Sequence, residues 1–419
     1  MQVYKFGGAS VKDASGVKNL AKIISLNQEK QLLIVVSAMG KMTNALEALT
    51  NAYIKGENSC YQLLEEISQY HQDILAELFD DDKHPIFNEV ANTLVEIEWM
   101  LEEDPHPDYN FNYDQIVSIG ELLSTRIVNA YLNTEGLKSQ WLDARSFIQT
   151  DNTYREGMVD WDKTCTAIRR RIPNLLQDQF LVTQGFIGGT SENFTTTLGR
   201  EGSDYSAAIF AACLQAESLT IWKDVPGVLS ADPKLFPETH KYDTLPYSEA
   251  IEMTYYGASV IHPKTIKPLQ NLNIPLLVKP FMSPEENGTL VNGAAQVCVD
   301  FPAIIVKQNQ TLASFSTKDF SFVSEDHLSE IFRVFARLHI KINMMQTSAL
   351  SFSACFDSDE QKFGTLLPTL AADFKIKYNN DLQLVTVRHY KQEIIDQLSA
   401  GKVILMEQLS RNTAQLVIK

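Results

Sequence analysis

The segment QLLIVVSA at residues 31–38 constrains the fold of this chain more than any other. It is a continuous apolar run that ends in small residues, which is typical of a strand buried on both faces of a parallel sheet. Helical spacing of apolar residues precedes it at about 14–25 and follows it over much of 43–135. Further strands are expected at 2–6, 139–144, 179–188, 218–225 and 274–280. Strands alternating with helices predict an α/β sheet with helices on both faces.

The pattern changes after about Phe301. TLASFSTK, EDHLSEIFRVFARL, IKINMMQTS and LSFSACFDSD predict strand, helix, strand and strand, and the stretch from LQLVTVRHY to TAQLVIK repeats this order more faintly. We therefore expect a domain at 1–293 and a region at 302–419 made of two small α+β units. These units would span about 310–375 and 380–419, the second abbreviated. The stretch PFMSPEENGTLVNG at 280–293 is the best boundary.

Composition excludes several classes of protein. A net charge of −16 argues against a nucleic-acid or anionic-membrane partner. No apolar run approaches the roughly 20 residues that cross a bilayer, and the N-terminus enters its first strand at once, without room for a signal peptide. The five cysteines lie far apart without a CxxC pair, which favours a reducing cytoplasm over a disulfide framework or a zinc site.

The stretch TTTLGREGSDYSAAIFAACLQA at 195–216 places Gly199, Arg200, Gly202 and Asp204 at the start of an alanine-rich helical pattern. A helix N-terminus attracts anions, and an arginine adds donors for a carboxylate or phosphate. Asp204 would repel such a ligand, so it suits a cation, a metal or a neighbouring lysine. The alternative is an ordinary helix capped by Ser203 or Asp204.

Other segments also combine strand ends with glycines or small residues. YKFGGAS places Lys5 in a strand that ends in a Gly7–Gly8 turn, where backbone amides can hold phosphate oxygens while the lysine neutralises their charge. A surface lysine beside a turn is the alternative. VVSAMGKMTN ends a buried strand in the manner of a ligand crevice. IWKDVPGVLSADPKLFP is consistent with a surface turn or with a nucleotide pocket.

Together these motifs closely resemble the aspartate kinases of the amino acid kinase family. The matching segments are Lys5-Phe6-Gly7-Gly8 with Ser10-Val11, Ser37-Ala38 with Thr43-Asn44, Gly120-Glu121-Leu122, Gln184 to Gly188, Thr195 to Arg200 with Gly202 to Tyr205, Asp224 to Gly227 with Asp232-Pro233, and Gly257-Ala258 with His262-Pro263. The resemblance covers about residues 2–293 in unbroken order and continues into paired ACT-like regulatory units.

The resemblance implies the amino acid kinase fold and ATP-dependent phosphorylation of the L-aspartate side chain to 4-phospho-L-aspartate, the first step towards lysine, threonine and methionine. ATP and Mg²⁺ are the implied cofactors, and no metal ligand is assigned. The chemistry agrees with this activity, because an aspartate carboxylate is ionised at pH 7 and needs no general base. Cations, backbone amides and metal must instead bring two anions together.

Roles carried over from the family fall on matching positions. Lys5 would stabilise the γ-phosphoryl in transfer, Asp204 would orient Lys5, and Arg200 would clamp a substrate carboxylate; these three are the catalytic candidates. Glu121 would pair with the substrate ammonium. The other aspartate-pocket candidates are Ser37, Ala38, Thr43, Phe186 and Ser203. The ATP-binding candidates beside Lys5 are Gly7, Gly8, Ser10, Ser203, Lys223, Asp224, Leu229, Asp232, Lys234, Ser259 and Val260.

This chain departs from the family pattern mainly in the nucleotide pocket and the regulatory region. The departures are Ala9, Lys223, Leu229, Lys234, Ser259 and Glu325-Asp326. The resemblance implies a homodimer or larger assembly through the ACT-like units, inhibited by lysine or threonine, with lysine favoured. The candidate effector residues are Ser324, Asn343, Gln346, Thr347 and Ser348, unless they only cap turns. Two other functions stay open: another acyl-phosphate kinase of the same family, and a non-catalytic ACT-type amino-acid sensor.

Overall fold

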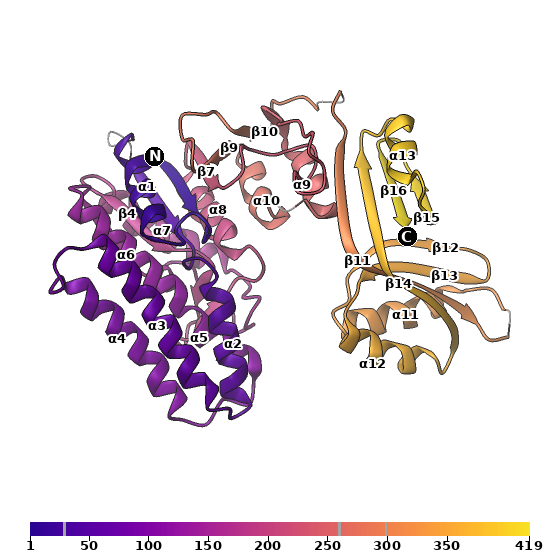
Figure 1. Ribbon diagram of the computed structural model, residues 1–419, viewed down its shortest axis with the longest axis horizontal. Coiled ribbons are helices and arrows are strands. Elements are labelled where there is room, and N and C mark those ends of the chain that lie inside the picture. Colours follow the sequence, from indigo (N-terminus) through magenta and orange to yellow (C-terminus); the bar gives the residue numbers. More distant parts are fainter. Residues whose placement is uncertain (28–30, 259–260, 298–299, 320) are drawn as a thin grey trace. The chain divides into compact units, whose positions relative to one another are not determined.

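The computed structural model describes residues 1–27, 31–258, 261–297, 300–319 and 321–419, and it forms two compact units (Figure 1). The N-terminal unit comprises Met1–Val228, Lys241–Ile251 and Val260–Val297. The C-terminal unit comprises Leu229–His240, Glu252–Ser259 and Cys298–Lys419. Each unit is built around a sheet of its own.

The N-terminal unit contains an eight-stranded sheet in the order β3-β4-β2-β1-β7-β9-β10-β8. Its strands are β1 (Gln2–Phe6), β2 (Leu32–Val36), β3 (Ser139–Leu142), β4 (Phe180–Gln184), β7 (Ser218–Lys223), β8 (Thr244–Pro246), β9 (Leu276–Pro280) and β10 (Thr289–Asn292). Among the described residues, neighbouring strands run parallel except β9 with β10. Every residue of β2 is buried, so the buried parallel strand predicted from QLLIVVSA is confirmed. A separate antiparallel ribbon joins β5 (Ile187–Gly189) to β6 (Thr195–Thr197).

Helices cover both faces of this sheet. They are α1 (Ala14–Ser25), α2 (Met42–Ile54), α3 (Ser59–Leu78), α4 (Pro85–Leu101), α5 (Tyr109–Val117), α6 (Ile119–Thr134), α7 (Trp161–Leu175), α8 (Gly202–Leu214) and α10 (Pro263–Asn271). The helix α9 (Tyr247–Tyr256) begins in this unit, and its second half belongs to the C-terminal unit. Tyr4, Phe6 and Ile34 of the sheet share one apolar core with α1 to α6, which Figure 1 shows gathered side by side. Lys5 points to the opposite face, where α8 packs on β1 and is flanked by α7 and α10. In the described part of the chain, none of the helices has the length and apolar character of a membrane span.

The C-terminal unit contains a six-stranded antiparallel sheet in the order β12-β13-β11-β14-β16-β15. Its elements are β11 (Ala303–Thr317), α11 (Glu325–Arg337), β12 (Ile342–Thr347), β13 (Ser351–Asp357), α12 (Glu360–Leu370), β14 (Phe374–Arg388), α13 (Gln392–Ser399), β15 (Ile404–Leu409) and β16 (Thr413–Ile418). The sequence pattern did not predict α12, nor that β11 and β14 are 15 residues long. The two long strands pair with each other and run through both halves of the sheet.

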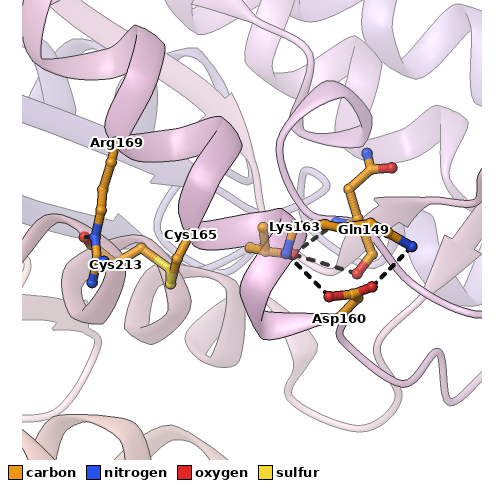
Figure 2. Close-up of a disulfide and its surroundings, with 7 residues drawn as sticks. Gln149, Asp160, Lys163, Cys165, Arg169 and Cys213 are labelled. Atoms are coloured by element: carbon orange, nitrogen blue, oxygen red, sulfur yellow. Dashed lines mark hydrogen bonds and ion pairs between the residues drawn. A yellow bond between two sulfur atoms is a disulfide. The ribbon is translucent and has the colours of Figure 1, made fainter.

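Cys165 in α7 and Cys213 in α8 form a disulfide, which the interpretation of the cysteines as a reducing-cytoplasm pattern without a disulfide framework did not anticipate. Figure 2 shows the bond with Arg169 beside it, whose Nε donates to the carbonyl of Cys213 at 2.7 Å. Sequence spacing cannot reveal such a pair, because only the packing of α7 on α8 brings the two cysteines together. The prediction of a reducing compartment therefore loses the support that it drew from the cysteines. Cys60 and Cys355 are free and buried, and Cys298 lies outside the described residues.

Reduction of this disulfide is expected to lower the free energy of unfolding by about 4 kcal/mol, because the bond closes a loop with a sequence separation of 48 residues. Urea unfolding with and without dithiothreitol measures the difference. The double variant Cys165→Ser, Cys213→Ser is the control. Its unfolding curve should match that of the reduced wild type and should not change when dithiothreitol is added. Identical wild-type curves in both conditions would contradict the prediction.

Candidate functional site

The carboxyl ends of β1 and β7 bring two lysines to the same face of the sheet. The strands pair in parallel with Lys5 opposite Ile221, so Lys223, two residues further on, lies on the same face as Lys5. The N-terminal turn of α8 carries Asp204 to this point. Open α/β sheets bind ligands at the carboxyl ends of their strands. The arrangement therefore forms the floor of a candidate site.

Asp204 holds both lysines. Its Oδ1 lies 2.5 Å from Lys5 Nζ and its Oδ2 lies 3.4 Å from Lys223 Nζ. Burial would raise the pKa of Asp204, but the two ammonium groups lower it below its ordinary value. The carboxylate thus stays ionised between the two ammonium groups. The partly buried Glu201, whose pKa burial raises, also interacts electrostatically with both lysines. The Asp204 carboxylate can therefore orient Lys5 towards a phosphoryl group.

The Gly7–Gly8 turn lies against the segment that follows β2. A Cβ atom on Gly8 would come within 2.6 Å of the Ala38 carbonyl oxygen, so only glycine fits there. The amide of Gly40 donates to the Gly8 carbonyl at 3.0 Å. Ser10 donates its backbone N–H to the Gly7 carbonyl at 2.9 Å and is buried. The structure therefore brings the phosphate-loop candidates next to the aspartate-pocket candidates.

Glu121 lies in the first turn of α6 with a buried side chain, and none of the ion pairs in the described part of the chain involves it. Its Oε1 accepts the amide of Ala38 at 3.4 Å, and its Oε2 has no hydrogen-bond partner among the described residues. Burial raises the pKa of Glu121 to about 8, although the Ala38 hydrogen bond acts in the opposite direction. Ser37 lies in the same place, because its carbonyl accepts the hydroxyl of Ser124 in α6 at 2.7 Å. Thr43 lies half-buried in the first turn of α2. A buried carboxyl group with one oxygen left without a partner suits a cationic ligand group.

The turn that carries Arg200 joins β6 to α8. Phe186 has a left-handed backbone with φ of 69°, and its carbonyl accepts the amide of Leu198 at 2.8 Å. A Cβ atom on Gly185 would lie 2.5 Å from the Cβ of Ser203, which packs this segment tightly on α8. The side chain of Arg200 is exposed. The alternative that Ser203 or Asp204 caps the helix is wrong, because the N-cap is Glu201, which makes no side-chain cap bond.

The nucleotide candidates fall in three places. Lys223 and Asp224 lie at the end of β7 in the N-terminal unit. Leu229, Asp232 and Lys234 belong to the 229–240 segment of the C-terminal unit, where Asp232 Oδ1 accepts the amide of Lys234 at 2.9 Å. Ser259 and Val260 lie outside the described residues.

The effector candidates lie on α11 and on the edge of the C-terminal sheet. Ser324 is the N-cap of α11, and the Ser348 hydroxyl lies 2.8 Å from that of Ser351 within a turn. Asn343 accepts from Lys307 Nζ at 2.8 Å and donates to Gln310 and Asp357. Gln346 and Thr347 are exposed on the edge strand β12.

Sequence reasoning missed one residue beside this site, Asp114. Asp114 in α5 is fully buried, and it accepts hydrogen bonds from the backbone of Arg155 and from Thr197. Burial raises the pKa of Asp114 to about 6, with these bonds acting in the opposite direction. Asp114 does not belong to a recognisable motif. A carboxylate in the mostly apolar context YDQIV was the only available signal.

The described residues contain no cluster of three or more His, Cys, Asp or Glu side chains that could hold a metal ion. Both oxygens of Asp204 already face lysines. These donors fit a Mg²⁺ ion that arrives with nucleotide phosphates and water, and they do not fit an all-protein metal cage.

Comparison with known proteins gives consistent results. The model of the amino acid kinase family matches residues 1–280. The lysine-sensitive aspartokinase 3 of Escherichia coli is 31% identical over 394 residues, which cover 92% of this chain and 86% of that protein. The chain covers only 32% of a chloroplastic bifunctional aspartokinase/homoserine dehydrogenase of Arabidopsis thaliana, at 33% identity over 69% of this chain.

Two solved structures of E. coli aspartokinase III are similar over 100% of this chain. The R-state complex with aspartate and ADP has a TM-score of 0.86 at 27% identity, and 96% of that chain is covered. The T-state complex with lysine and aspartate has a TM-score of 0.82 at 29% identity, and 95% of that chain is covered.

Proposed function

Because the chain belongs to the amino acid kinase family, we propose that it is an aspartate kinase, which transfers the γ-phosphoryl group of ATP to the side-chain carboxylate of L-aspartate. The observation that carries this proposal is the buried Lys5–Asp204 ion pair beside the Gly7–Gly8 turn. It supplies a fixed cation beside a glycine turn where two anions have to meet. We assign catalysis to the N-terminal unit and regulation to the C-terminal unit.

In the proposed reaction a carboxylate oxygen of aspartate attacks the γ-phosphorus of ATP, the bond to the β-phosphate oxygen breaks, and ADP leaves. Lys5 neutralises charge on the transferring group and Asp204 keeps Lys5 in place. Glu121 binds the substrate ammonium and Arg200 a substrate carboxylate, which fixes the attacking group. Ser37, Ala38, Thr43, Phe186 and Ser203 complete the aspartate pocket.

The proposed nucleotide site combines the glycine turn with the end of β7. Gly7, Gly8 and Ser10 would surround the phosphates together with Ser203, Lys223 and Asp224. Leu229, Asp232, Lys234, Ser259 and Val260 stay nucleotide-binding predictions that rest on the family resemblance alone. Mg²⁺, bound with the phosphates, would supply additional neutralisation of their charge.

ADP release with aspartate, glutamate, acetylglutamate or carbamate as the only acceptor tests this function. We expect turnover with aspartate at least about a hundredfold faster than with the other acceptors. Acetylglutamate and carbamate have no ammonium for Glu121, and glutamate is one methylene too long to hold its ammonium at Glu121, one carboxylate at Arg200 and the other at the phosphoryl group at once. Faster turnover with another acceptor would favour a different acyl-phosphate kinase. No release with any acceptor would favour the non-catalytic sensor.

The regulatory proposal concerns the C-terminal unit. We propose that it pairs with a second copy of the chain and binds lysine or threonine, with lysine favoured. The E. coli relative whose structure contains lysine supports this choice. Ser324, Asn343, Gln346, Thr347 and Ser348 are the proposed effector contacts.

Lysine is expected to inhibit more strongly than threonine in initial-rate assays at fixed aspartate with each amino acid raised to millimolar levels. An effector must bind the less active arrangement more tightly, because only differential affinity shifts an equilibrium. Ser348→Ala should weaken inhibition and leave uninhibited turnover unchanged. A flat response to both amino acids would leave the C-terminal unit as a dimerisation element only.

A further inference from the structure

Asp114 connects α5 to the two segments that flank the Arg200 turn. Its Oδ2 accepts the amides of Arg155 and Thr197, each at 2.9 Å, and its Oδ1 accepts the hydroxyl of Thr197 at 2.7 Å. Asp114 has no exposed surface. A buried carboxylate that accepts hydrogen bonds from backbone amides fixes the position of the segments to which those amides belong, here the segments of Arg155 and Thr197.

The next residue of α5 holds the other end of the same strand. Gln115 accepts the amide of Thr195 at 3.1 Å and donates to the carbonyl of Thr195 at 2.9 Å. The strand β6 is only three residues long and pairs only with β5 in the described sheet. Asp114 and Gln115 therefore bind both ends of β6 to α5, and Thr197 precedes Arg200 by three residues.

The backbone around Arg200 is held in uncommon conformations. Arg155, Phe186 and Glu201 are left-handed, with φ of 67°, 69° and 53°, and Gly199 has φ of 78°. Residues other than glycine adopt such angles at a cost, and they keep them only where neighbouring contacts hold them. One of those contacts is the bond from the Arg155 amide to Asp114. A second is the bond from Leu198 to Phe186.

The loop that contains Arg155 packs directly on the same turn. The amide of Gly157 donates to the Thr197 carbonyl at 2.8 Å, and a Cβ atom on Gly199 would lie 3.3 Å from the Arg155 carbonyl oxygen. The guanidinium of Arg155 lies 4.2 Å from the ring centre of Tyr113 and 3.3 Å from Glu47, one helical turn after Thr43. The loop thus spans from α2 and α5 to the Arg200 turn.

We propose that Asp114 is a positioning residue of the aspartate pocket, which acts by fixing the backbone that carries Arg200. Arg200 is exposed, so its own side chain has little packing to place it. Its position then depends on the backbone of residues 197–201, to which the Asp114 bonds contribute. Lys5 and the Gly7–Gly8 turn lie on and after β1 and make none of these bonds. The inference rests on the proposed aspartate kinase activity.

The test compares Asp114→Ala with Asp114→Asn in steady-state assays. Asp114→Ala should raise the KM for aspartate by about tenfold or more, because small displacements of a clamping group cost large factors, and the KM for ATP should stay within about twofold. Asp114→Asn should restore the aspartate KM to within about threefold of wild type. An amide oxygen can accept both backbone N–H groups while its NH₂ group donates to the Thr197 hydroxyl.

Asn133→Ala is the control, since it loses hydrogen bonds between α6 and Ser139 in the same unit and should leave the aspartate KM unchanged. If Asp114→Ala does not fold, Thr197→Val removes the hydroxyl bond alone and should raise the aspartate KM by about threefold. An unchanged aspartate KM in the folded variants, or an equal rise for ATP, overturns the inference. Failure of wild type to use aspartate overturns the proposed function instead.

Discussion

Lys5→Ala is expected to lower kcat by about a thousandfold or more while the protein remains folded. Lys5 acts on charge that is concentrated on the phosphoryl group during transfer, so its loss removes stabilisation of the transition state. The loss should not unfold the chain, because Lys223 still pairs with the buried Asp204 at 3.4 Å. Initial rates of ADP release at saturating aspartate and ATP measure the effect, and circular dichroism checks the fold.

Lys12→Ala is the matched control for Lys5→Ala. Lys12 lies in the loop between β1 and α1 with an exposed side chain, so its removal changes the net charge equally without touching Asp204. Its kcat should stay within about twofold of wild type, as for most surface substitutions. Near-normal turnover of a folded Lys5→Ala variant would remove Lys5 from the mechanism.

The fold could be predicted where apolar periodicity is strong. The buried strands of the parallel sheet and the long helices follow directly from their side-chain patterns. The helix α12 was not predicted, because it contains Gly364 and Pro368, which normally indicate a break in a helix. The strand β14 was predicted only from Leu382 onward, because residues 375–381 are mainly polar and exposed. Long strands with exposed halves lack the signal that burial creates.

Some features of the candidate site could likewise be predicted from local sequence, and others could not. Lys5, Arg200 and Asp204 lie in local motifs at strand ends and helix starts, so a single stretch of sequence carries each signal. Asp114 and the Cys165–Cys213 disulfide depend on which elements pack together, and no spacing in the sequence encodes that. The role of Lys223 needed the structure too, because its distance to Asp204 follows from strand register.

The KM for aspartate is expected to fall about tenfold for each pH unit between pH 6 and 8. Burial raises the pKa of Glu121 to about 8, so the carboxyl group is mostly protonated at pH 7 without substrate. The substrate ammonium requires the ionised form, and binding must release a proton below pH 8. The folded-state pKa exceeds the unfolded value, so the same group should also lower the free energy of unfolding as pH rises from about 4.5 to 8.

Glu121→Gln separates this charge from the shape of the pocket. Without an ionisable group at this position the aspartate KM should rise by about a hundredfold at pH 8, since a buried charged hydrogen bond is lost, and it should no longer vary with pH. The KM for ATP should change by less than about threefold and serves as the internal control. Initial rates at varied aspartate and varied ATP from pH 6 to 8.5 give the two KM values for wild type and variant.

An equal rise of the KM for aspartate and the KM for ATP would assign Glu121 a structural role. A pH-dependent KM that persists in Glu121→Gln would place the titrating group elsewhere, and Asp114, whose pKa burial raises to about 6, would be the next residue to replace.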